Sequence, residues 1–224
     1  MEKFTEETGI KTNVVYATKG LAQRLKAEGK NSPADVILTV DIGRLYIYDD
    51  LDLLASVNSD ILDRNIPQNL KSPENKWFAL SKRSRIIVTS KDRVKEGQIT
   101  KIEDLADEQW KGRVCSRPGS HVYNRALMAS LILSLGEKAA EEWAKKFVGN
   151  LARRPQGNDR AQVKAIFEGQ CDISIINNYY FGKLKYSDDP SQREWAKSVR
   201  LIFPNQDAED RGAHVNICLL YTSP

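Results

Sequence analysis

Three tyrosines stand where predicted strands give way to the following segment. Tyr179 and Tyr180 come directly after residues 172–178, whose apolar run is typical of a buried strand, and Tyr123 follows a shorter run at residues 113–116. Phenolate is a hard oxygen donor that suits a highly charged cation such as Fe(III), whereas Zn²⁺ and Ca²⁺ more usually take His, Cys or carboxylate ligands. A phenol has an ordinary pKa of about 10, so a metal would have to supply the charge that removes the proton. Adjacent tyrosines also commonly serve packing alone, and the residues by themselves leave both interpretations open.

The elements that must position these tyrosines alternate along the chain. Strands are predicted at residues 11–17, 36–40, 77–80, 85–90, 113–116, 151–154, 172–176 and 199–203, with residues 36–40 buried on both faces and a basic bend between 80 and 85. Helices are predicted at residues 2–9, 20–29, 44–54, 124–135, 137–148, 159–168 and 179–184. Two strand-and-helix series joined by a crossing strand predict an α/β protein with two doubly wound lobes. Ligands of such sheets lie beyond the carboxyl ends of the strands, which is where the tyrosines fall.

Composition excludes several classes of protein. The 224 residues carry 34 Lys and Arg against 30 Asp and Glu, with 41% hydrophobic residues, so a packed core is expected. The longest nearly apolar run, residues 126–135, is too short to cross a bilayer. The basic residues are dispersed, which argues against nucleic-acid binding. A Gly-rich phosphate loop and a nucleophile elbow are both absent from the sequence, so an enzyme that uses the cleft is disfavoured.

Other residues with chemical potential have plainer interpretations. Cys115 and Cys171 each lie in or beside a predicted strand; if those strands are neighbours the two thiols can form a disulfide, and otherwise they are buried free thiols. Three scattered cysteines do not predict a zinc cluster. His121 is interpreted as a solvated loop residue, and Asp159 as the cap of the helix that follows it.

Six blocks of sequence carry a resemblance to a known family. In order they are SKRSR (81–85), WKGRVC (110–115), RPQGNDRAQ (154–162), NYY (178–180), FPNQD (203–207) and HVN (214–216). Together they closely resemble the periplasmic ferric-iron-binding proteins that serve ABC transporters. The resemblance covers nearly all of residues 2–217.

The resemblance implies both a fold and a function. It implies a two-lobed periplasmic binding protein fold, type II-like and incomplete, that is not an enzyme and clamps Fe(III) between its lobes. The implied metal ligands are Tyr123, Tyr179 and Tyr180. Arg85 matches a basic residue that holds a synergistic anion or neutralises phenolate charge; the alternative for Arg85 is an exposed charge beside the hinge. The implied partner is an ABC permease in the inner membrane, served by a periplasmic monomer.

The resemblance also sets the expected division of the chain. Residues 1–84 are expected to form the first lobe, 85–90 the crossing strand and hinge, 91–199 the second lobe, 200–217 the return to the first lobe, and 218–224 a non-native tail. The chain starts without the basic and apolar regions of a signal peptide, and both of its ends are expected to be cut. A first-lobe ligand is therefore expected to be missing, with weaker iron binding as the result. A protein of the same fold that binds a small anion through Arg85 is the alternative function.

Overall fold

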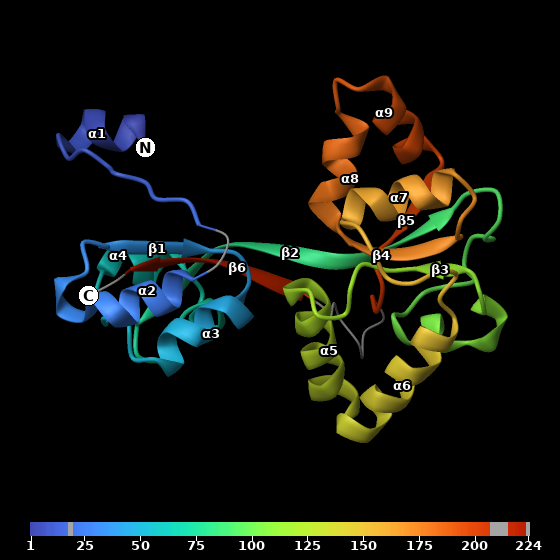
Figure 1. Cartoon of the computed structure of the whole chain (residues 1–224), viewed down its shortest axis with the longest axis horizontal. Helices are drawn as coiled ribbons and strands as arrows, with labels where there is room; N and C mark the ends of the chain where they lie inside the picture. Colours follow the sequence, from blue (N-terminus) through green and yellow to red (C-terminus); the bar gives the residue numbers. More distant parts are fainter. Residues whose placement is uncertain (18–19, 207–214, 223–224) are drawn as a thin grey trace.

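The computed structural model describes residues 1–17, 20–206 and 215–222, and within them one mixed sheet crosses the whole molecule (Figure 1). The strands are β1 Val36–Thr39, β2 Trp77–Ser90, β3 Val114–Cys115, β4 Ile173–Asn177, β5 Val199–Ile202 and β6 Val215–Thr222. The α-helices are α1 Glu2–Thr8, α2 Leu21–Glu28, α3 Ile42–Asp50, α4 Asp60–Asn65, α5 Val122–Leu135, α6 Glu137–Gly149, α7 Asp159–Phe167, α8 Asn178–Lys185 and α9 Pro190–Lys197. The strand order is β1-β6-β2-β4-β3, and β5 also pairs with β2.

Strand β2 links the two halves of the molecule. Its first part pairs antiparallel with β6 up to Ser84, and from Arg85 onward it pairs antiparallel with β4 and then β5. Figure 1 shows β1, β6 and helices α2 to α4 gathered at one end of β2, and α5 to α9 with β3 to β5 at the other. The predicted pair of strands around a basic bend is therefore wrong, because β2 is continuous. Backbone pairing continues through the basic residues, and the buried cations Arg83 and Arg85 each pair with a carboxylate, which offsets the cost of burying them.

The second half of β2 is buried on both faces. Ile86 and Val88 pack into a core with helices α7 to α9, whereas Ile87 packs into a core with Trp110 and helices α5 and α6. This alternation follows from the two-residue period of a strand. The cores on the two faces fix β4, which lies beside β2, and β3, which runs parallel to β4.

In the other half of the molecule, strand β1 is covered on one face only. Ile37 of β1 is buried in a core with Leu25 and Leu45, but Val36 and Leu38 are 55% and 64% exposed. The prediction that residues 36–40 are buried on both faces is thus wrong, because no described element covers the side that Val36 and Leu38 occupy. The prediction of a strand at residues 11–17 is also wrong, because these residues are exposed and pair with no described strand.

Several local predictions are confirmed, and others are corrected. Helix α1 lies within the predicted residues 2–9 and ends at Gly9, whose φ of 72° supplies the left-handed cap. Helix α9, for which no range is predicted, is capped by Asp189. Residues 151–154 form no strand, because only Leu151 bridges to Val114. Helix α4 lies between the predicted helix at 44–54 and the predicted strand at 77–80, where no element is predicted. Residues 218–222 belong to β6, residues 223–224 lie outside the described residues, and the non-native origin of 218–224 stays a prediction.

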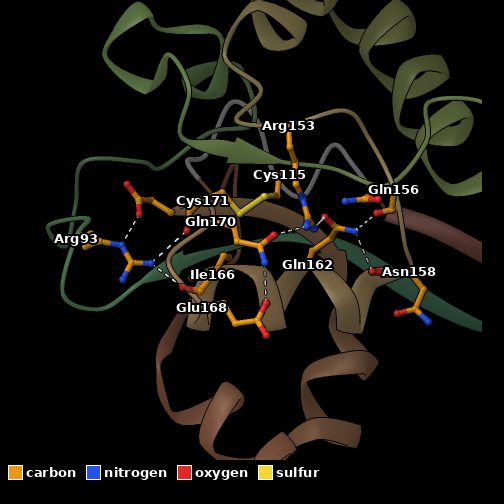
Figure 2. Close-up of a disulfide and its surroundings, with 11 residues drawn as sticks. Arg93, Cys115, Arg153, Gln156, Asn158, Gln162, Ile166, Glu168, Gln170 and Cys171 are labelled. Atoms are coloured by element: carbon orange, nitrogen blue, oxygen red, sulfur yellow. Dashed lines mark hydrogen bonds and ion pairs between the residues drawn. A yellow bond between two sulfur atoms is a disulfide. The ribbon is translucent and has the colours of Figure 1, made fainter.

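A disulfide joins Cys115 to Cys171 and decides between the two alternatives for these cysteines. Their Cα atoms are 5.8 Å apart, and the bond links the end of β3 to the segment before β4 (Figure 2). Beside it, Gln162 of α7 donates to the carbonyl oxygens of Gln156 and Asn158. The disulfide and these hydrogen bonds fix the loop that leads into α7.

Candidate metal centre

The structure brings the three predicted tyrosines together. The hydroxyl oxygens of Tyr123 and Tyr179 lie 3.3 Å apart, and the ring of Tyr179 packs against that of Tyr180 with centroids 4.4 Å apart. Tyr123 is buried, while Tyr179 and Tyr180 are half-buried. Two oxygens therefore meet at one point, with a third phenol adjacent.

Parallel pairing of β3 and β4 produces this convergence. Val114 is in register with Ile173, so both strands end at the same edge of the sheet. Helix α8 begins directly after β4, and α5 begins after a short loop that follows β3. The tyrosines therefore occupy the first turns of two neighbouring helices.

Three guanidinium groups surround the ring of Tyr123. The Cζ atoms of Arg83, Arg117 and Arg85 lie 4.4, 4.8 and 5.9 Å from its centroid. Cations at these distances are attracted to the face of an aromatic ring. They also place positive charge beside Tyr123, where it would offset the negative charge of phenolates bound to a metal.

Arg85 is only 1% exposed, so its interpretation as an exposed hinge charge is wrong. Its Nη1 donates to Asp159 Oδ2 at 3.0 Å and to Asn177 Oδ1 at 3.2 Å. Its Nη2 donates to Asn124 Oδ1 at 2.8 Å and to the carbonyl oxygen of Ile175 at 3.3 Å. Both terminal nitrogens of Arg85 are thus already engaged by the protein.

Asp159 is a site residue that the sequence interpretation missed. Asn158, not Asp159, caps α7 by accepting from the backbone N–H of Ala161. Asp159 is fully buried and pairs with both Arg85 and Arg117. Arg85 lies in a predicted strand, and a buried arginine needs a carboxylate partner from elsewhere in the chain. That need was the signal in the sequence that could have pointed to a buried acidic residue such as Asp159.

His121 is half-buried and is not a solvated loop residue. Its Nδ1 caps α5 by accepting from the backbone N–H of Tyr123 at 3.2 Å. Burial and the nearby Arg117 lower the pKa of His121 to about 4, so the imidazole is neutral and can accept this hydrogen bond.

Burial, together with hydrogen bonds shared with Tyr123 and Tyr180, raises the pKa of Tyr179 above its ordinary value. The phenol of Tyr179 therefore holds its proton more firmly than an ordinary phenol. Among the described residues, His, Cys, Asp and Glu form no group of three or more that could hold a metal.

The part of the chain that the structure describes also holds no helix long and apolar enough to cross a membrane.

Comparison with known proteins identifies the family to which the chain belongs. Residues 17–212 match the model of the bacterial extracellular solute-binding protein family. The chain belongs to this family. Its members bind solutes and are not enzymes. A relative named iron uptake protein A1, from Synechocystis sp., is 47% identical over 96% of the chain. The Fe(3+)-binding periplasmic protein of Serratia marcescens is 30% identical over 97% of it.

Solved structures agree with this placement and with the expected two-lobed fold. A Trichodesmium protein in complex with iron and citrate ligands matches all of this chain and 70% of its own, with a TM-score of 0.92 and 45% identity. The apo ferric ion-binding protein A of Pasteurella haemolytica matches 99% of this chain and 68% of its own, with a TM-score of 0.89 and 43% identity. The chain spans 59% of the length of the Synechocystis relative and 62% of the Serratia relative.

Proposed function

We propose that this solute-binding protein captures Fe(III) between two lobes through the phenolates of Tyr123, Tyr179 and Tyr180. The observation that carries the proposal is the 3.3 Å separation of the Tyr123 and Tyr179 hydroxyl oxygens. Neighbouring ligands of a small octahedral cation lie about 3 Å apart, since bonds of about 2 Å meet near right angles. A hard trivalent ion offers the charge needed to remove the phenol protons. The names of the relatives, which bind ferric iron, support the same cargo.

Arg85 belongs to this proposal as a source of charge. Both of its terminal nitrogens donate to protein acceptors, which supports neutralisation of the phenolates over capture of an anion by Arg85.

We assign residues 1–84 to the first lobe, 85–90 to the crossing strand, 91–199 to the second lobe and 200–217 to the return. The change of pairing partners in β2 between Ser84 and Arg85 supports the first boundary.

A ferric titration tests the proposed ligands. Phenolate bound to Fe(III) gives a visible charge-transfer band, which we expect when ferric citrate is added to the protein. The double variant Tyr179→Phe/Tyr180→Phe should lose the band, because each ring remains but its oxygen is gone. The matched control is Tyr186→Phe, since Tyr186 ends the same helix and is 78% exposed. A double variant that keeps the band would rule out these ligands, and tight anion binding that survives in it would favour the small-anion alternative.

The proposed destination is an ABC permease in the inner membrane, served by a periplasmic monomer. Membership of the extracellular solute-binding family supports this role. The test is uptake of radioactive iron by cells whose own binding protein has been replaced by this chain or by its double variant. Uptake that does not depend on the tyrosines would contradict delivery through this site.

A further inference from the structure

The carboxylate of Asp159 accepts three hydrogen bonds in the buried layer beneath the tyrosines. Its Oδ1 accepts from Arg117 Nη1 at 2.7 Å, and its Oδ2 accepts from Arg85 Nη1 at 3.0 Å. Oδ2 also accepts from the backbone N–H of Asn177 at 2.8 Å. Asp159 is completely buried, so water does not take over any of these contacts.

These three contacts connect the two helices that carry the tyrosines. The Asn177 amide lies at the end of β4, immediately before α8, which presents Tyr179 and Tyr180. Arg117 lies against the ring of Tyr123 at the start of α5. Arg85 reaches the same helix through Asn124, the residue that follows Tyr123. One carboxylate therefore joins the start of α5 to the start of α8.

Only a carboxylate satisfies all three partners, because every one of them is a donor. An amide in the place of Asp159 would turn its NH₂ toward either Arg117 on one side, or Arg85 and the Asn177 amide on the other. It would also leave two buried guanidinium groups without their counter-charge. Position 159 therefore requires the negative charge of a carboxylate, and a side chain of the same shape without that charge does not suffice.

We propose that Asp159 is a positioning residue for iron capture, which holds the Tyr123 phenol in reach of the Tyr179 phenol by binding Arg85, Arg117 and the Asn177 amide together. This inference rests on the proposed function, and it concerns a residue that contacts none of the three tyrosine hydroxyls. Loss of the carboxylate releases the start of α8 and the arginines packed on Tyr123, so the two oxygens move apart.

The chain offers a control with the same pairing chemistry. Asp172 is also a carboxylate between two arginines of the same half, Arg93 and Arg113, but it lies at the opposite end of β4 from the tyrosines. The variants Asp159→Asn and Asp172→Asn each remove one charge from a bridge between two arginines. They differ in where that bridge lies and in its burial, because the side chains of Arg93 and Arg113 are 40% and 34% exposed whereas those of Arg85 and Arg117 are buried.

The experiment is a ferric citrate titration of both variants in the full chain, read by the charge-transfer band. Asp159→Asn should weaken iron binding about tenfold or more and move the band maximum, since a buried donor or charge loses its partner. It should also speed hydrogen exchange at the Asn177 amide. Asp172→Asn should keep the band maximum and bind iron within about twofold of the unmodified chain.

A second variant guards against loss of folding. Arg117→Gln leaves Asp159 paired with Arg85, and it should move the band maximum in the same direction. If Asp159→Asn and Arg117→Gln both keep the band and the affinity of the unmodified chain, or if Asp172→Asn changes them equally, the assignment is overturned. Failure of the unmodified chain to give any band would instead overturn the proposed function, so the two failures are distinct.

Discussion

Arg83 Nη2 donates to Asp41 Oδ2 at 3.2 Å, and both side chains are buried. Asp41 caps α3, in the half of the molecule that holds β1 and β6, by accepting from the Gly43 N–H. The same Arg83 guanidinium lies 4.4 Å from the ring centroid of Tyr123, which belongs to α5 in the other half. One arginine on the shared strand β2 therefore contacts both halves beside the tyrosine site.

The first prediction concerns this ion pair. Asp41→Asn keeps the cap on Gly43, and Asn tolerates the φ of 78° at this position, but it leaves Arg83 buried without its counter-charge. We expect the free energy of unfolding to fall by about 3 kcal/mol, measured by urea denaturation. Glu141→Gln removes the exposed pair with Lys145 and should change nothing measurable. Equal effects from both variants would contradict a buried pair at Asp41.

The second prediction isolates one phenol oxygen. Tyr123→Phe keeps the ring between its arginines and removes only the hydroxyl that lies 3.3 Å from Tyr179. We expect a weaker charge-transfer band and at least about tenfold weaker ferric binding, with unfolding changed by about 1 kcal/mol. Titration and thermal melting together check this. A variant that binds iron normally would remove Tyr123 from the ligand set.

The third prediction concerns the disulfide. Replacing Cys115 and Cys171 by Ala frees a loop of 56 residues in the unfolded chain. Chain entropy then favours unfolding by about 4 kcal/mol relative to the oxidised protein. Denaturation with and without reductant measures this difference, which should vanish in the double variant. A reductant effect that persists there would exclude the Cys115–Cys171 bond as its source.

The fourth prediction concerns acid stability. Burial alone would raise the pKa of Asp172, but hydrogen bonds from Arg93 and Arg113 outweigh it and lower that pKa below 3.8. A lowered carboxyl pKa contributes stability that is present above pH 3.8 and is lost as the pH falls through the lowered value. Asp172→Asn should therefore flatten the loss of stability below that pH. Urea melts across an acid series measure the slope, and an unchanged slope would contradict the bridge.

Much of the candidate site could be predicted from the sequence. So could most of the helices and strands in the half of the molecule that holds β3 to β5. Residues 172–176 form a nearly continuous apolar run, which clearly predicts a buried strand. The tyrosines that follow this strand must then lie at the carboxyl edge of the sheet. Prediction failed where burial depends on distant partners. Residues 11–17 have the composition of a strand but pair with no described strand, and residues 36–40 are apolar although one face is uncovered.

The sequence by itself determined which residue types reach the sheet edge, because strand period, helix starts and chain order are local properties. It could not determine which charges neutralise one another. Asp159 and Arg85 are 74 positions apart, and only the packing of α7 against β2 and β4 makes them partners. The tertiary structure likewise decided that Cys115 and Cys171 are bonded and that Tyr123 meets Tyr179. Such pairs depend on long-range register and on the cost of burying an unpaired charge, which no local pattern records.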